Sequence, residues 1–151
     1  MNSGNDIIIR EPVGRLMNKI SRMFLASLHK NLAHLDIERS FYPLVLIEAG
    51  NGNLTQKDLA EKLSCGKVQV VRIINYLSLH GYVKRGENTS DRRKCSLEIT
   101  DKARKYLPDI KKALEETTSI VLQDIPESKI DELYNLLTIM NKNLSSHNHL
   151  K

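Results

Sequence analysis

The stretch HGYVKRGENTSDRRKCSLEIT, residues 80–100, decides the fold of this chain. Residues 82–85 and 94–99 have the pattern of two short β-strands, and the polar residues 86–93 form the loop between them. This loop contains Asp91 followed by two arginines, Arg92 and Arg93. The segments on either side have helical spacing, so we expect a β-hairpin inside a mainly α-helical protein.

The second strand of this hairpin places its apolar residues at alternate positions. Cys95, Leu97 and Ile99 alternate with Lys94, Ser96 and Glu98, so we interpret Cys95 as a small residue that faces the core. Cys65 and Cys95 have neither metal-ligand spacing nor a Cys-x-x-Cys arrangement. Both are expected to be ordinary reduced thiols.

Four helices are predicted before the hairpin. Residues 13–35 carry apolar side chains at three- and four-residue steps, and residues 40–49 follow with Pro43 in the first turn. Residues 54–63 form the third helix, with Thr55 as its N-cap and Asp58 three residues later in a variant of the capping box. Residues 68–80 form the fourth helix, which Gly81 ends.

Two further helices are predicted after the hairpin. The first begins at residue 101 after the capping residue Thr100, and Pro108 inside it predicts a kink or a break. The last helix begins around Pro126 and continues through Leu144. We expect the tail, residues 145–151, to be frayed.

The composition is that of one globular domain. The chain has 151 residues, of which 40% are hydrophobic and 27% charged, and this is enough to bury a core. No apolar run approaches the roughly 18 residues that span a bilayer, and the polar start lacks the layout of a secretory signal. A single domain in the cytoplasm is the expectation.

The positive charge is concentrated in one part of the chain. The formal net charge is +5, and residues 64–94 contain seven Lys or Arg against two Asp or Glu. The remaining residues are balanced, with sixteen basic and sixteen acidic side chains. A basic patch on a neutral body favours an anionic partner such as nucleic acid, although a solvated face would have the same charge.

The helices at 54–63 and 68–80, joined by a tight turn and followed by a hairpin, have the order of a winged helix-turn-helix. The face of the second helix opposite its apolar stripe presents Val68, Arg72 and Asn75, flanked by Gln69, Val71 and Tyr76. Arg can pair with guanine, Gln can pair with adenine, and valine methyl groups can contact thymine. We therefore interpret this helix as the recognition helix, which would enter the major groove.

Basic residues nearby can contact phosphates or the minor groove. Lys67 lies at the positive N-terminus of the recognition helix, and Arg92 or Arg93 of the loop could enter a minor groove. Asp91 would then pair with a neighbouring arginine and orient it. Arg85 and Lys94, at the loop-facing ends of the predicted strands, complete the candidate DNA-binding residues.

Each of these features also has an ordinary explanation. In an isolated helix, Val68 and Val71 would be expected to pack on a neighbouring helix and Arg72 to be solvated. In an arbitrary hairpin, residues 91–93 would be a charged turn. The order of helix, turn, helix and hairpin is what favours DNA binding here.

The sequence resembles the MarR (multiple antibiotic resistance regulator) family of bacterial transcription factors. The resemblance rests on LTQKDLAEKL (54–63), VVRIINYLSLHGYVKR (70–85), and SDRRKCSLEIT (90–100) followed by DKARKYL. It implies a mainly α fold with a small hairpin wing, in one domain over residues 1–151. The winged helix-turn-helix would occupy about 40–100, and the dimerisation helices about 8–37 and 101–146.

The resemblance also implies a function. It places Val68, Gln69 and Arg72 on the recognition helix and Arg92 and Arg93 on the wing. It implies a homodimer that binds a palindromic operator. Such a dimer usually acts as a repressor, and a small aromatic ligand often releases it from the DNA. The early recognition-helix residues 66–71 differ from the Ser- and Thr-rich pattern of many members, so no operator preference follows.

Three other functions were considered. A winged-helix module that binds an acidic protein would use the same basic face, and a regulator that senses oxidation would use Cys65 or Cys95. In the peroxide-sensing branch of the family, however, the reactive cysteine lies in the N-terminal helical region. An enzyme has little support, because the five histidines have no metal spacing and there is no phosphate-binding glycine loop. We expect no cofactor, no metal and no enzymatic activity.

Overall fold

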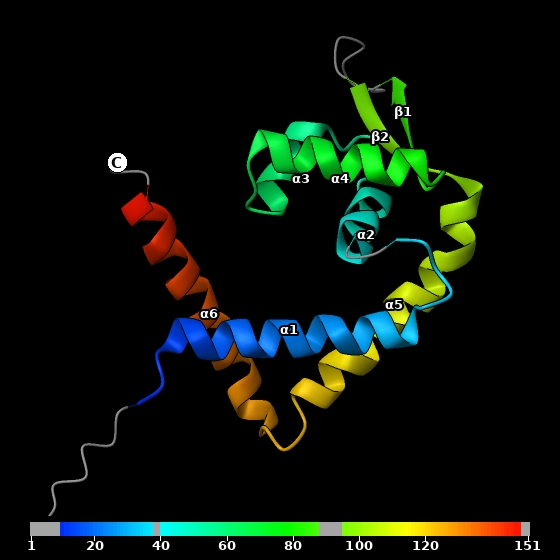
Figure 1. Ribbon diagram of the computed structural model, residues 1–151. Coiled ribbons are helices and arrows are strands. Elements are labelled where there is room, and N and C mark those ends of the chain that lie inside the picture. Colours follow the sequence, from blue (N-terminus) through cyan, green and yellow to red (C-terminus); the bar gives the residue numbers. More distant parts are fainter. Residues whose placement is uncertain (1–9, 38–39, 88–94, 149–151) are drawn as a thin grey trace, which may run out of the picture. The chain divides into compact units, whose positions relative to one another are not determined.

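The computed structural model describes residues 10–37, 40–87 and 95–148, and within them the protein is mainly α-helical with one small β-hairpin (Figure 1). Both features were predicted. The elements are α1 (Val13–Asn31), α2 (Phe41–Ala49), α3 (Gln56–Lys62), α4 (Lys67–Leu79), β1 (Val83–Glu87), β2 (Cys95–Ile99), α5 (Asp101–Val121) and α6 (Glu127–Asn148). The chain divides into two compact units, residues 1–117 and 118–151.

The first helix is shorter than its apolar pattern predicted. α1 ends at Asn31, whereas the prediction extended to residue 35. Leu32 and Leu35 are nevertheless buried, and the N–H of Leu35 donates to the carbonyl oxygen of Leu32 at 2.9 Å in a turn. The apolar pattern extends beyond the end of the helix because the following turn also buries its leucines in the core.

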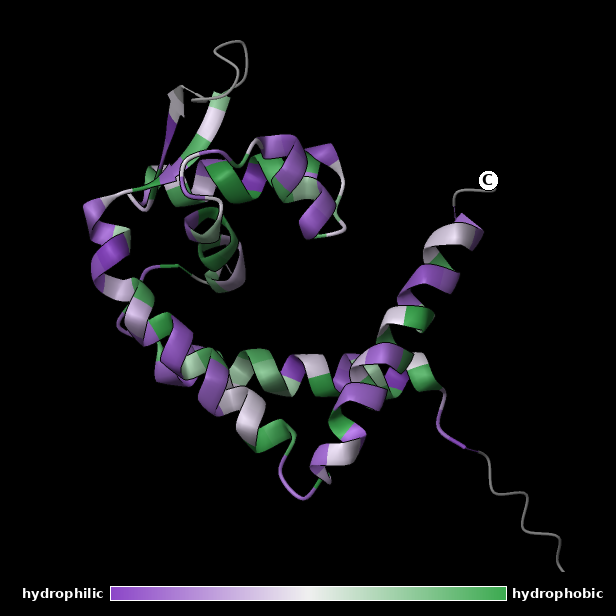
Figure 2. Ribbon diagram, turned by 180° about the vertical axis from the view of Figure 1, so that it is seen from behind, coloured by the Kyte–Doolittle hydropathy of each residue, from purple (hydrophilic) through white to green (hydrophobic). Residues whose placement is uncertain are grey.

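The second helix lies at the centre of the first unit. Phe41, Pro43, Leu44 and Ile47 of α2 are buried, and Figure 2 shows hydrophobic residues along most of this helix. Pro43 lies in the first turn as predicted, where a missing N–H removes no helical hydrogen bond. α2 contacts both α3 and β2 and so supports the winged helix-turn-helix from within.

The short helix α3 begins with the capping box that the sequence predicted. The backbone N–H of Asp58 donates to Thr55 Oγ1 at 3.2 Å, and the N–H of Thr55 donates to Asp58 Oδ2 at 2.9 Å. Leu54 and Leu59 flank the cap and are both buried. A helix of this length depends on its cap and its packing, because isolated short helices are unstable in water.

Gly81 ends the recognition helix α4, as predicted. Gly81 has a φ of +74°, and its N–H donates to the Ser78 carbonyl at 3.0 Å. The N–H of Tyr82 donates to the Leu77 carbonyl at 2.8 Å, and these two bonds form a Schellman motif. The chain therefore turns sharply after α4, with Tyr82 buried directly beyond the turn.

The hairpin is antiparallel, with Val83 opposite Ile99 and Glu87 opposite Cys95. β1 begins one residue later than predicted and includes Gly86 and Glu87, which the sequence pattern assigned to the loop. β2 begins at Cys95 rather than Lys94.

The prediction that Cys95 faces the core is wrong. Cys95 is exposed, whereas Ser96 is fully buried. The reason is the backbone of residues 54–55: Thr55 forms a β-bridge with Ser96, and the Leu97 N–H donates to the Leu54 carbonyl at 2.8 Å. This third segment covers Ser96, while Cys95 is the first residue of β2 and lies at the loop end of the hairpin.

The helix after the hairpin is uninterrupted. α5 starts after Thr100, whose Oγ1 accepts from the Ala103 N–H at 3.3 Å as the predicted cap requires. The helix passes through Pro108, so the break that the sequence allowed does not occur. Figure 2 shows that α5 alternates between hydrophilic and hydrophobic residues.

In the second unit, α6 continues to Asn148. The tail predicted to be frayed is therefore helical over residues 145–148. In the described part of the chain, no helix has both the length and the apolar character needed to cross a membrane.

Candidate nucleic-acid interface

The recognition helix α4 is fixed by one apolar face. Val70, Ile74 and Leu77 have exposed fractions of 1%, 0% and 0% and lie in the main core. Because 3.6 residues make one turn, anchoring these three side chains turns the opposite face of α4 to solvent.

Most of the predicted base-contacting residues share that solvent face. Lys67, Gln69, Arg72 and Asn75 are exposed, and Val68 has 71% of its surface exposed. Leu79, in the last turn of the same face, is 84% exposed. The face combines two apolar side chains with groups that can form hydrogen bonds with the edges of bases.

Val71 and Tyr76 have different positions from the other candidates. Val71 is half-buried. Tyr76 is also half-buried, and its hydroxyl donates to the Asp36 carbonyl oxygen at 3.0 Å, while its ring centroid lies 4.2 Å from that of His80. Tyr76 therefore joins α4 to the connection between α1 and α2.

Only part of the predicted wing site can be placed. Arg85 is exposed and lies opposite Leu97 in the hairpin. Its neighbour Lys84 forms an ion pair with Glu98 at 3.2 Å, and Arg85 is not part of this pair. Asp91, Arg92, Arg93 and Lys94 lie outside the described residues.

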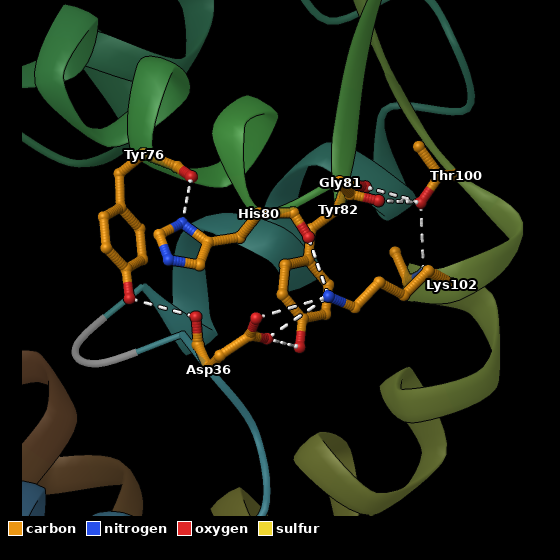
Figure 3. Close-up of polar contacts among 8 residues, drawn as sticks. Asp36, Tyr76, His80, Gly81, Tyr82, Thr100 and Lys102 are labelled. Atoms are coloured by element: carbon orange, nitrogen blue, oxygen red, sulfur yellow. Dashed lines mark hydrogen bonds and ion pairs between the residues drawn. The ribbon is translucent and has the colours of Figure 1, made fainter.

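A polar network joins the C-terminal end of α4 to Asp36 (Figure 3). The Tyr82 hydroxyl donates to Asp36 Oδ1 at 2.5 Å, and Lys102 Nζ lies 3.3 and 3.4 Å from the two carboxylate oxygens. Lys102 also donates to the His80 carbonyl oxygen at 2.7 Å and lies 4.3 Å from the centroid of the Tyr82 ring. Asp36 therefore bridges residues of α4, the turn after it and the start of α5.

Thr100 closes the same turn from the other side. Its Oγ1 donates to the Gly81 carbonyl oxygen at 2.6 Å, and its backbone N–H donates to the Tyr82 carbonyl oxygen at 3.0 Å. Figure 3 shows Thr100 and Lys102 approaching the turn from the start of α5. The end of the recognition helix is thus held from two directions.

The network changes the acidity of two of its members. The hydrogen bond from Tyr82 holds the pKa of the Asp36 carboxyl below its ordinary value, and the Lys102 ammonium group acts in the same direction. Burial raises the pKa of the Tyr82 hydroxyl, and the neighbouring Asp36 carboxylate raises it further. At neutral pH the network therefore consists of a carboxylate, a neutral phenol and an ammonium ion.

The sequence pattern did not identify Asp36 or Lys102 as part of this site. Asp36 is 46 residues from Tyr82 and 66 from Lys102, so no local spacing relates them. Tyr82 was recognised only as the start of a strand. One usable signal was present, because a buried tyrosine requires a hydrogen-bond partner for its hydroxyl group.

The solvent face of α4 is suited to binding. Over the ranges that the structure describes, no group of three or more His, Cys, Asp or Glu side chains is placed to hold a metal ion. The α4 face offers hydrogen-bond donors and methyl groups on a rigid helix. Such a face can recognise the edges of bases in a groove.

Comparisons with known proteins agree with this geometry. Residues 41–94 match the model of the MarR family. The curated HTH-type transcriptional regulator BilQ of Clostridioides difficile is 22% identical over 130 residues, which cover 86% of this chain and 88% of that protein.

Two solved structures share the fold over most of the chain. The transcriptional regulator SlyA is 24% identical with a TM-score of 0.82, covering 93% of this chain and 100% of that one. CouR from Rhodococcus jostii, solved bound to p-coumaroyl-CoA, is 23% identical with a TM-score of 0.76, covering 86% of this chain and 92% of that one. The winged-helix fold predicted from the sequence is thus confirmed.

Proposed function

We propose that the chain is a winged-helix transcription regulator of the MarR family, whose model matches residues 41–94, and that it reads the sequence of double-stranded DNA with α4. Members of this family regulate transcription and are not enzymes. The observation that carries the proposal is the solvent face of α4, where Val68 is 71% exposed beside the exposed Gln69 and Arg72. An exposed valine among hydrogen-bond donors is explained by contact with a thymine methyl group.

We assign different roles to the helix and the wing. Val68, Gln69, Arg72 and Asn75 contact base edges, with Val71 at the margin of that surface, and Lys67 contacts phosphate near the N-terminus of α4. Arg85, Arg92, Arg93 and Lys94 contact the backbone or an adjacent minor groove. Tyr76 lies at the edge of the base-reading face and ties α4 to Asp36 through its hydroxyl.

The active form is proposed to be a homodimer that binds a palindromic operator. The support within the chain is a stripe of exposed apolar side chains on α1: Val13, Leu16, Met17, Ile20 and Met23. Apolar patches of this kind mark interaction surfaces. A symmetric dimer would place two α4 helices on half-sites about one helical turn apart.

We further propose that the protein is a cytoplasmic repressor released from DNA by a small aromatic ligand. The support is by analogy, since CouR shares the fold and binds p-coumaroyl-CoA. A ligand that binds the DNA-free conformation more tightly than the DNA-bound one lowers DNA affinity by that difference. Aromatic acids and their CoA thioesters should therefore be screened for release of the bound duplex.

Selection from random duplex DNA tests the central proposal. The full-length protein should enrich a related set of palindromic duplexes, and its affinity for them should fall steeply as salt rises. Enrichment of no sequence, or binding that is insensitive to salt, contradicts the proposal. If the R92A/R93A variant keeps its DNA affinity but loses binding to an acidic protein, the winged helix is a protein-interaction module.

A further inference from the structure

Asp36 contacts α4 at one point and the turn that follows it at another. Its backbone carbonyl accepts from Tyr76 in the last turn of α4, and its carboxylate accepts from Tyr82 beyond the end of that helix. Figure 3 shows the Tyr76 hydroxyl at the backbone carbonyl of Asp36 and the Tyr82 hydroxyl at its carboxylate. Two attachment points on one residue restrict rotation of α4 about its axis as well as movement of its end.

The apolar anchors of α4 determine which face is buried, but they set the rotation of the helix less narrowly than hydrogen bonds do. Val70, Ile74 and Leu77 hold the helix against the core, but apolar burial is non-directional. Hydrogen bonds weaken steeply when their angles change. The Asp36 contacts therefore select one rotation of α4 among those that would bury the same apolar residues.

Lys102 connects this arrangement to α5. Its Nζ contacts the Asp36 carboxylate and also donates to the His80 carbonyl at the end of α4. The carboxylate is thus held in place by two donors from different elements. Because 55% of the Asp36 side chain remains exposed, replacing Asp36 by Asn creates neither a cavity nor a buried charge.

We propose that Asp36 is a positioning residue for DNA recognition, which sets the angle at which α4 presents Arg72 and its neighbours to the bases. This inference rests on the proposed DNA-binding function. Base recognition requires side chains held within about 0.5 Å and 10–20° of their working geometry. Phosphate contacts tolerate a larger displacement, because they depend mainly on charge. Loss of Asp36 should therefore lower discrimination between sequences more than it lowers general affinity.

The test compares D36N with D109N in the full-length protein. Asp109 on α5 is a matched control, because 60% of its side chain is exposed and its contact with His34 at 3.9 Å lies outside the network. Both substitutions remove one negative charge. For each variant, affinities are measured for the selected duplex and for a shuffled duplex over a range of salt concentrations.

The ratio of these affinities should fall about tenfold in D36N, the scale of one lost base contact, and stay unchanged in D109N. The dependence on salt should be the same in both variants. Y82F, which removes only the second hydrogen-bond partner, should lower the ratio similarly, with Y42F as its control on α2. The double variant D36N/Y82F should lose little more than either single variant, because both changes act on the same hydrogen bond, which D36N weakens and Y82F removes.

Two outcomes overturn this inference alone. One is a ratio that stays at the wild-type value in D36N and Y82F. The other is an equal loss of affinity for both duplexes accompanied by a lower melting temperature, which would assign Asp36 to fold stability. A wild-type protein that prefers no duplex overturns the proposed function itself, and the inference with it.

Discussion

At the scale of single residues, we propose two groups of side chains in the candidate interface, one that reads bases and one that binds phosphate. Arg72 lies on the solvent face of a helix anchored by buried residues. Arg92 and Arg93 belong to the predicted wing, where their role stays a prediction. The two groups should differ in how their loss affects binding.

Replacing Arg72 by Ala should blur base preference at one position of the operator and cost about 1–3 kcal/mol of specific binding. Replacing Arg92 or Arg93 by Ala should weaken binding to all duplexes and lower the salt slope by about 1. Gel shifts at several salt concentrations, on operators mutated one base pair at a time, measure both effects. R104A, an exposed arginine on α5, is the control. If the variants R72A, R92A and R93A all behave alike, the assigned roles are wrong.

The acid dependence of stability should report the Asp36 network. Because the folded state lowers the Asp36 pKa, the carboxylate contributes stability above its ordinary pKa of 3.8 and loses it as pH falls through the lower folded value. The difference in unfolding free energy between the wild type and D36N should therefore shrink in acid. Urea unfolding at a series of pH values measures it, with D109N as reference. A difference that persists unchanged into acid would show that the carboxylate charge contributes nothing.

At the scale of secondary-structure elements, the ends of the helices carry much of the architecture. The capping box fixes the start of α3, and the Schellman motif at Gly81 turns the chain from α4 into β1. This turn also places Tyr82 within reach of Asp36. The end of α4 is therefore both a local chain reversal and the attachment point of the polar network.

Replacing Gly81 by Ala should destabilise the protein by about 1–2 kcal/mol, the cost of a left-handed conformation for a residue with a Cβ atom. The cost is conformational, because the nearest atom to an added Cβ would be Lys102 Cδ at 3.9 Å. Chemical unfolding measures the loss. The control is G14A in α1, where an added Cβ meets nothing within 4 Å and should cause no loss. Equal stability of both variants would argue against a required left-handed turn.

At the scale of the whole molecule, α1 carries a stripe of apolar side chains that the single chain leaves exposed. Ile20 is 47% exposed and Leu16 43% exposed, whereas Leu28 on the same helix is 2% exposed. The C-terminal part of α1, which contains Leu28, therefore packs into the hydrophobic core. The other end is available for the proposed second copy of the chain.

The variant I20D should be monomeric at concentrations where the wild type is dimeric, because a carboxylate in an apolar interface is costly to desolvate. A monomer occupies one half-site, so operator affinity should fall by about 100-fold or more. Sedimentation and gel shifts measure the two effects. N18D places the same charge on the opposite face of α1 and should change neither. A dimeric I20D variant would exclude this face of α1 from the interface.

The sequence by itself determined the elements of the protein and their order. Apolar spacing predicted all six helices, and local chemistry predicted the cap at Thr55 and the end of α4 at Gly81. These features depend on residues within a few positions of one another, so a single stretch contains the information. The solvent face of α4 followed from the same spacing, which is why most of the base-reading candidates were identified before the structure.

The tertiary structure decided what depends on distant partners. It ended α1 at Asn31 while Leu32 and Leu35 stayed buried, and it exposed Cys95 because residues 54–55 cover Ser96 instead. It also joined Asp36 to Tyr76, Tyr82 and Lys102. The spacing of apolar residues in a helix or strand shows which side of that element is apolar. It does not show which other segment packs against the end of the element. That segment decides which terminal residues are buried and which hydrogen-bond partners they find.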